Sequence, residues 1–167
     1  EIVIPFKNLL NDAYCRDISV KIRSHLEIKR KQGQYIGNYV SYGYRKCDDD
    51  KHKIEIDTYA ANVVKDIFRM KLQGMSQDAI ACKLNENGIL CPADYKKSEG
   101  SNYQTSFKIK DKSGWSSTTV RRILTNEIYI GNLVQGKHTT PNHKVKKMYV
   151  KDESCLLYTS DAADEAR

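Results

Sequence analysis

The sequence predicts a mainly α-helical protein with small β elements. A long N-terminal helix is followed by a helix-turn-helix-like domain of three helices with short β-hairpins. Three observations support this fold class: an apolar period of 3.6 residues across 5–33, shorter helical patterns with capping residues across 57–124, and tyrosine-rich segments interrupted by glycines after residue 33.

The long helix is predicted over residues 5–33. Its apolar side chains recur three or four positions apart and form one stripe. They are Phe6, Leu9, Leu10, Ala13, Tyr14, Ile18, Ile22 and Leu26. Pro5 suits the first turn and Gly33 the position after the last one. A helix of this length spans about 42 Å.

Positive charge gathers in the second half of this helix. Between Arg16 and Lys31 there are six Lys or Arg and two acids. We expect the first half to pack against protein and the second half to lie on an anionic polymer. The candidate contacts are Arg23, Lys29, Arg30 and Lys31. The alternative is a surface helix with a solvated basic face.

The C-terminal segment 155–167 is left outside the fold prediction. Residues 155–165, CLLYTSDAADE, resemble the translation of a sequencing-library adapter rather than native protein. The segment carries −2 of the net charge of +7, so residues 1–154 carry +9. This basic balance favours a nucleic-acid partner. The sequence has no run of eighteen apolar residues, so we expect no membrane contact.

Motifs for metal, cofactor or covalent chemistry are not found in the sequence. Its first four cysteines lack C-x-x-C spacing, which argues against a zinc ribbon or a redox pair and favours reduced thiols in the cytoplasm. The acids Asp48–Asp50 beside His52 are typical of a polar turn. We expect no metal, no cofactor and no catalytic residue. Since the chain starts without Met or a signal peptide, we expect it to begin inside a longer protein.

A small hairpin is predicted after the long helix, with strands at Tyr42–Lys46 and Ile54–Ile56 around a polar turn. Tyr42, Tyr44 and Arg45 are candidate contacts for sugar and phosphate, because aromatic and cationic side chains lie together. The alternative is that one or both tyrosines pack the hairpin on the core.

Two helices are predicted next, capped by Asp57 and Ser76 and ended by Gly74 and Gly88. Their apolar faces are Ala60, Val63, Val64, Ile67, Phe68 and Leu72, then Ala79, Ile80, Ala81 and Leu84. Residues 92–114 are polar and are predicted as a long loop.

A third helix is predicted from a cap at Ser116 or Ser117 to Leu124, anchored by a partly buried Trp115. Its inward residues are Val120, Ile123 and Leu124, and its outward residues are Ser117, Thr118, Arg121 and Arg122. Hydroxyl and guanidinium groups in this position suit a recognition helix in the major groove. The alternative is a helical core with an exposed basic helix. A strand at 129–134 should follow, with the basic segment 144–150 as its partner.

Several motifs resemble those of the large serine recombinases. They are D-I-S-V-K-I-R at 17–23, G-x-Y-I-G at 33–37, Y-G-Y-R-K at 42–46, D-x-x-A-A-x-V-V-K-x-I-F at 57–68, G-M-S-x-x-x-I-A-x-x-L-N-E-x-G-I at 74–89, W-S-S-x-T-V-R-R-I-L-x-N at 115–126 and Y-I-G at 129–131. The resemblance is nearly continuous over residues 5–140, and the subgroup is similar to transposon-type recombinases.

The resemblance implies a function and a domain order. Such proteins cut both DNA strands with an upstream serine, hold phosphoserine links, rotate subunits and religate, without metal or ATP. Residues 1–33 would be the dimerising, DNA-crossing helix, and 34–154 the domain that binds a half-site of double-stranded DNA. The catalytic domain and a downstream zinc ribbon would lie outside this chain. The alternatives are a stand-alone helix-turn-helix regulator and an RNA-binding protein.

Overall fold

The computed structural model describes residues 3–100, 113–152 and 156–159. The chain divides into two compact units: residues 1–36 with 127–167, and residues 37–126. We call them the first and the second unit and describe each by itself. The mix of helices with short antiparallel strand pairs confirms the predicted fold class, mainly α with small β elements.

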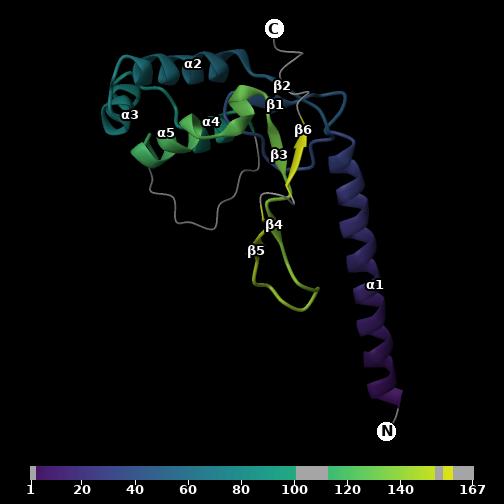
Figure 1. Cartoon of the computed structure of the whole chain (residues 1–167). Coiled ribbons are helices and arrows are strands. Elements are labelled where there is room, and N and C mark those ends of the chain that lie inside the picture. Colours follow the sequence, from purple (N-terminus) through teal and green to yellow (C-terminus); the bar gives the residue numbers. More distant parts are fainter. Residues whose placement is uncertain (1–2, 101–112, 153–155, 160–167) are drawn as a thin grey trace. The chain divides into compact units, whose positions relative to one another are not determined.

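The second unit is built around three helices that pack on one another: α2 (Thr58–Leu72), α3 (Gln77–Glu86) and α5 (Ser117–Leu124) (Figure 1). Their fully buried side chains include Ile67, Ile80, Leu84 and Val120. The predicted caps are confirmed, because the Asp57 side chain accepts from the Ala60 N–H and the Ser76 side chain from the Ala79 N–H. The helical periods and caps therefore predicted most of this core, but Ala79, predicted on the apolar face of α3, is exposed.

The apolar face of α2 differs from the prediction at its last turn. Leu72 was expected inside, but it is 88% exposed, and Met70 is buried instead. The geometry explains the difference. Met70 follows Val63 by seven residues and Ile67 by three, so it shares their face, whereas Leu72 is rotated by about 140° from Ile67.

A small hairpin opens the second unit. Strands β1 (Tyr44–Lys46) and β2 (Ile54–Ile56) are antiparallel, and Arg45 lies opposite Glu55. The strand was predicted to begin at Tyr42, but β1 begins at Tyr44. Gly43, between these two tyrosines, has a φ of +97°. That left-handed conformation suits glycine and ends the strand before Tyr42.

Helix α4 (Pro92–Ser98) corrects the prediction of a long loop at 92–114. Pro92 stands in the first turn, where a missing N–H is tolerated, and acidic Asp94 is followed by basic Lys96 and Lys97, as the helix dipole favours. These signals were present within a polar stretch. Residues 101–112 of the predicted loop lie outside the described residues.

The first unit contains α1 (Val3–Lys31), the predicted long helix. It begins two residues before Pro5, which is thus the third residue and still lies in the first turn, where its lack of an N–H costs no hydrogen bond. At the other end Gly33 has a φ of +76°, and the Gln34 N–H donates to the Lys29 carbonyl. This is the glycine-ended helix terminus that was predicted.

The rest of the first unit corrects the predicted strands. Residues 129 and 130 belong to the 3-10 helix η1 (Glu127–Ile130), and the strand β3 is shorter, Leu133–Gln135. The partner of β3 is β6 (Leu157–Thr159), not the basic segment 144–150. Instead, β5 (Tyr149–Val150) pairs with β4 (His138–Thr139).

Strand β6 lies in the C-terminal segment 155–167, which the sequence prediction leaves outside the fold. The run Leu-Tyr-Thr has the β-branched and aromatic residues typical of strands. In the same unit the buried Gln135 accepts from the Ile36 N–H and donates to the Gln34 carbonyl, so β3 is joined to the segment that follows α1. Among the described residues, no helix has the length and apolar character needed to cross a membrane.

Candidate nucleic-acid interface

Helix α5 presents polar side chains on one side and apolar side chains on the other. Ser116 caps the helix by accepting from the Thr119 N–H. Val120 and Ile123 are buried, whereas Thr118, Arg121 and Arg122 are exposed. Ser117 is half-buried. The predicted inward and outward faces of this helix are therefore confirmed for all but Ser117 and Leu124, which are intermediate.

Trp115 anchors the start of α5, as predicted. Its side chain is 5% exposed, and its indole N–H donates to the Ile89 carbonyl at 2.9 Å. The ring lies edge-on to Tyr42 at 5.5 Å between centroids. The anchor therefore joins α5 both to the residues after α3 and to the segment before β1.

The hairpin residues that were candidates for DNA contact lie in different surroundings. Tyr42 is 5% exposed and packs edge-on against Tyr95 as well as Trp115, which agrees with the alternative in which it packs the hairpin on the core. Tyr44 is half-buried. Arg45 is exposed and forms an ion pair with Glu55 at 2.7 Å. Burial raises the pKa values of Tyr42 and Tyr44 above the ordinary value of a tyrosine.

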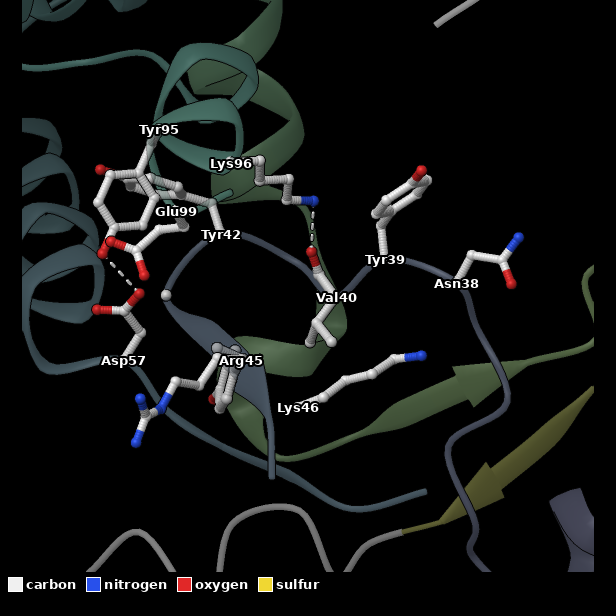
Figure 2. A pocket seen from close by; sticks show the side chains of 12 residues that line it. Asn38, Tyr39, Val40, Tyr42, Arg45, Lys46, Asp57, Tyr95, Lys96 and Glu99 are labelled. Carbon is white, nitrogen blue, oxygen red and sulfur yellow. Dashed lines mark hydrogen bonds between the residues drawn. The ribbon is translucent and has the colours of Figure 1, made fainter. Parts of the chain in front are cut away.

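A pocket of about 220 Å³ lies beside the hairpin and α4 (Figure 2). In it the Tyr95 hydroxyl donates to Asp57 Oδ2 at 2.8 Å, and Lys96 Nζ donates to the Val40 carbonyl at 2.7 Å. Burial lowers the pKa of Lys96, whose ammonium also lies 5.6 Å from the centre of the Tyr39 ring. The sequence prediction missed these α4 residues because it treated them as loop.

The candidate residues on α1 lie in the first unit, and two of the four are exposed. Arg23 is exposed and donates to the Ser19 hydroxyl at 2.7 Å. Lys31 is exposed and forms an ion pair with Glu27 at 3.1 Å. Lys29 and Arg30 are half-buried. The Lys31 hydrogen bond is the main cause that lowers the pKa of Glu27.

The candidates therefore form two sets, one in each unit. Arg23, Lys29, Arg30 and Lys31 belong to α1, whereas Tyr42, Tyr44, Arg45, Ser117, Thr118, Arg121 and Arg122 belong to the second unit. Within the described ranges, His, Cys, Asp and Glu side chains do not form a group of three that could hold a metal ion. The exposed groups are cations and hydroxyls, which bind phosphate and base edges.

Comparison with known proteins identifies the family. Residues 58–160, which include α2, α3, α4, α5 and the strands that follow, match the family model described as Recombinase. Neither a curated protein nor a solved structure matches the chain. The family match covers more than half of the sequence and agrees with a DNA-binding region of serine recombinases. The chain therefore belongs to the recombinase family, whose members act in DNA recombination.

Proposed function

We propose that the chain binds one half-site of double-stranded DNA for a serine site-specific recombinase, with α5 in the major groove. The observation that carries the proposal is the division of α5 into a buried face with Val120 and Ile123 and an exposed face with Thr118, Arg121 and Arg122. Arginine can form two hydrogen bonds with guanine, and hydroxyls can bind bases or phosphates. A helix supported from behind by a core presents such groups in a defined orientation.

Backbone contacts are assigned to the basic end of α1 and to the hairpin. Arg23, Lys29, Arg30 and Lys31 on α1, together with Tyr44 and Arg45 on β1, would contact phosphate and sugar. Ser117 at the start of α5 would contact a phosphate. In this proposal residues 1–33 cross the DNA, and residues 34–154 bind the flanking half-site.

The proposed reaction is that of the whole recombinase. A serine in an upstream catalytic domain cuts each strand through a phosphoserine link, subunits rotate and the ends are religated. The chain contributes binding and positioning. Its self-association would use the exposed apolar residues of α1, among them Phe6, Leu9, Leu10 and Tyr14, which are 54–67% exposed.

Binding and cleavage can be tested with the purified chain. Selection from random duplexes should enrich one sequence, and the chain should bind it more tightly than a scrambled duplex. The same chain should leave a supercoiled plasmid with the selected site uncut. If no sequence is enriched, α5 does not read bases. Nicking that follows the protein through purification would contradict the assignment of catalysis to another domain.

A further inference from the structure

The first unit contains a cleft between α1 and the hairpin formed by β4, β5 and the loop between them, residues 138–150. Two hydrogen bonds hold the loop on α1. Lys144 Nζ donates to Asp12 Oδ2 at 2.8 Å, and His143 Nε2 lies 3.2 Å from Asp12 Oδ1. The hydrogen bond with Lys144, followed by the one with His143, is the main cause that lowers the pKa of Asp12. The loop therefore lies along α1 as a second wall.

Two adjoining hollows of about 340 and 430 Å³ lie between these walls, and Arg23 lines both. The first is also lined by Arg30, Glu27, His138 and Lys151. The second is also lined by Arg16, His143 and Lys144. Cations come from both walls, so the charge of the cleft does not depend on α1 alone.

The arginines of α1 form a regular row in this cleft. Arg16, Arg23 and Arg30 are seven residues apart, which places them on one face of the helix at intervals of about 10.5 Å. Arginines this far apart cannot all contact one small ion. They can each contact a different phosphate of duplex DNA, which carries one charge per about 1.7 Å of its axis.

Arg30 adds an independent observation. Its Nε is buried and has no hydrogen-bond partner among the described residues. Gly136 lies beside the guanidinium, and a Cβ at that position would stand 3.6 Å from Arg30 Nε. A buried guanidinium N–H without an acceptor is costly, so the position of Arg30 in the cleft is not explained by its hydrogen bonds within the described residues.

We propose that this cleft is a binding site for DNA backbone phosphates, which the hairpin holds against Arg23, Arg30 and Lys151. The inference rests on the proposed function and extends it, because it adds Arg16, His143, Lys144 and Lys151 to the contact surface and makes the hairpin a clamp over α1. Tyr14 is nine residues before Arg23 and so lies about 180° around the helix. Leu10, thirteen residues before Arg23, lies about 140° away, so Leu10 and Tyr14 are left open for self-association.

The test compares two double variants of the whole chain, each of which loses one cation from α1 and one from a residue flanking β5. Arg23→Gln with Lys151→Gln removes cations from the cleft, whereas Lys21→Gln with Lys147→Gln removes cations that do not line it. Affinity for the selected duplex is measured from about 50 to 300 mM salt. Each lost phosphate contact lowers the slope of log affinity against log salt by about 0.9, so the cleft variant should lose roughly two units and the control much less.

Thermal unfolding distinguishes a loss of folding from a loss of phosphate contacts. Thermal midpoints of both variants should match the wild-type chain, and the single exposed substitution Arg16→Gln should lower the slope by about one unit if a double variant melts early. Equal slopes for the cleft and control variants would overturn the clamp, while selective binding to the enriched site would leave the proposed function standing. A wild-type chain that binds no duplex would overturn both.

Discussion

The side-chain amide of Asn85 forms two hydrogen bonds with the backbone of Trp115. Its Nδ2 donates to the Trp115 carbonyl at 3.0 Å, and its Oδ1 accepts from the Trp115 N–H at 2.8 Å. Asn85 lies in the last turn of α3, and Trp115 directly precedes the cap of α5. Gly114 allows this approach, because a Cβ there would stand 3.1 Å from Asn85 Oδ1. One side chain thus joins α3 to α5, the helix that the proposed function places in the major groove.

Replacing Asn85 should weaken this joint. Asn85→Ala leaves the Trp115 N–H and carbonyl without their partner, so we expect a loss of about 1–2 kcal/mol in unfolding free energy. Asn85→Asp keeps the acceptor and should lose less. Chemical denaturation followed by tryptophan fluorescence measures both, with the exposed Asn62→Ala on α2 as control. If Asn85→Ala is as stable as the control, the pair does not hold the helices together.

Sequence preference should depend on Arg121 and Arg122. If either side chain binds a base edge, its replacement by Ala should cost about 1–3 kcal/mol on the selected site and reduce the preference over a scrambled site. Arg69→Ala on α2 is the control, since Arg69 is exposed and paired with Asp66. The measurement is the ratio of the two dissociation constants at one salt concentration. An unchanged ratio in both arginine variants would exclude base readout by this helix.

The basic end of α1 should supply affinity without sequence preference. Lys29→Ala, Arg30→Ala and Lys31→Ala together should weaken selected and scrambled duplexes equally and reduce the salt slope by roughly two to three units. The matched control removes the same number of charges from α2: Lys65→Ala, Arg69→Ala and Lys71→Ala. Titrations at several salt concentrations give both slopes. A slope that stays at the wild-type value would mean that these side chains face solvent in the complex.

Self-association should depend on the apolar side of α1. Leu10→Asp places a charge among exposed apolar residues and should lower the association constant at least tenfold, which corresponds to about 1.4 kcal/mol. Asn8→Asp adds the same charge about 160° around the helix and is the control. Sedimentation velocity over a range of protein concentrations measures the effect. Equal behaviour of the two variants would place the contact elsewhere.

The second unit should lose stability in alkali. Burial raises the pKa of Tyr42 and, with the hydrogen bond to Asp57, that of Tyr95, whereas the unfolded phenols titrate near pH 10. The folded state therefore retains protons that the unfolded state releases. The resulting stability is complete below about pH 10 and is lost as the pH rises above it. Thermal midpoints between pH 8 and 11 should fall less steeply for Tyr42→Phe than for the wild-type chain, and parallel curves would contradict this assignment.

The sequence by itself determined the helices of this protein and most of their buried faces. Asp57, Ser76 and Ser116 cap their helices as predicted, and Gly33, Gly74 and Gly88 lie in the left-handed conformation just after the last turn. These signals act between residues that are at most five positions apart, so a local pattern contains the whole interaction. The exposed side of α5 follows from the same reasoning, because burial of Val120 and Ile123 leaves Arg121 and Arg122 outside.

Tertiary structure alone decided the contacts between distant segments. Tyr42 could have faced DNA or the core, and its burial depends on Tyr95 and Trp115, which are far away in the sequence. Strand β3 was predicted to pair with segment 144–150, but it pairs with β6, which joins residues more than twenty positions apart. Short strands carry too little pattern to specify a partner, so the choice depends on packing and loop closure across the whole unit. The cleft beside Arg23 has the same origin, because its second wall comes from a hairpin more than a hundred residues away.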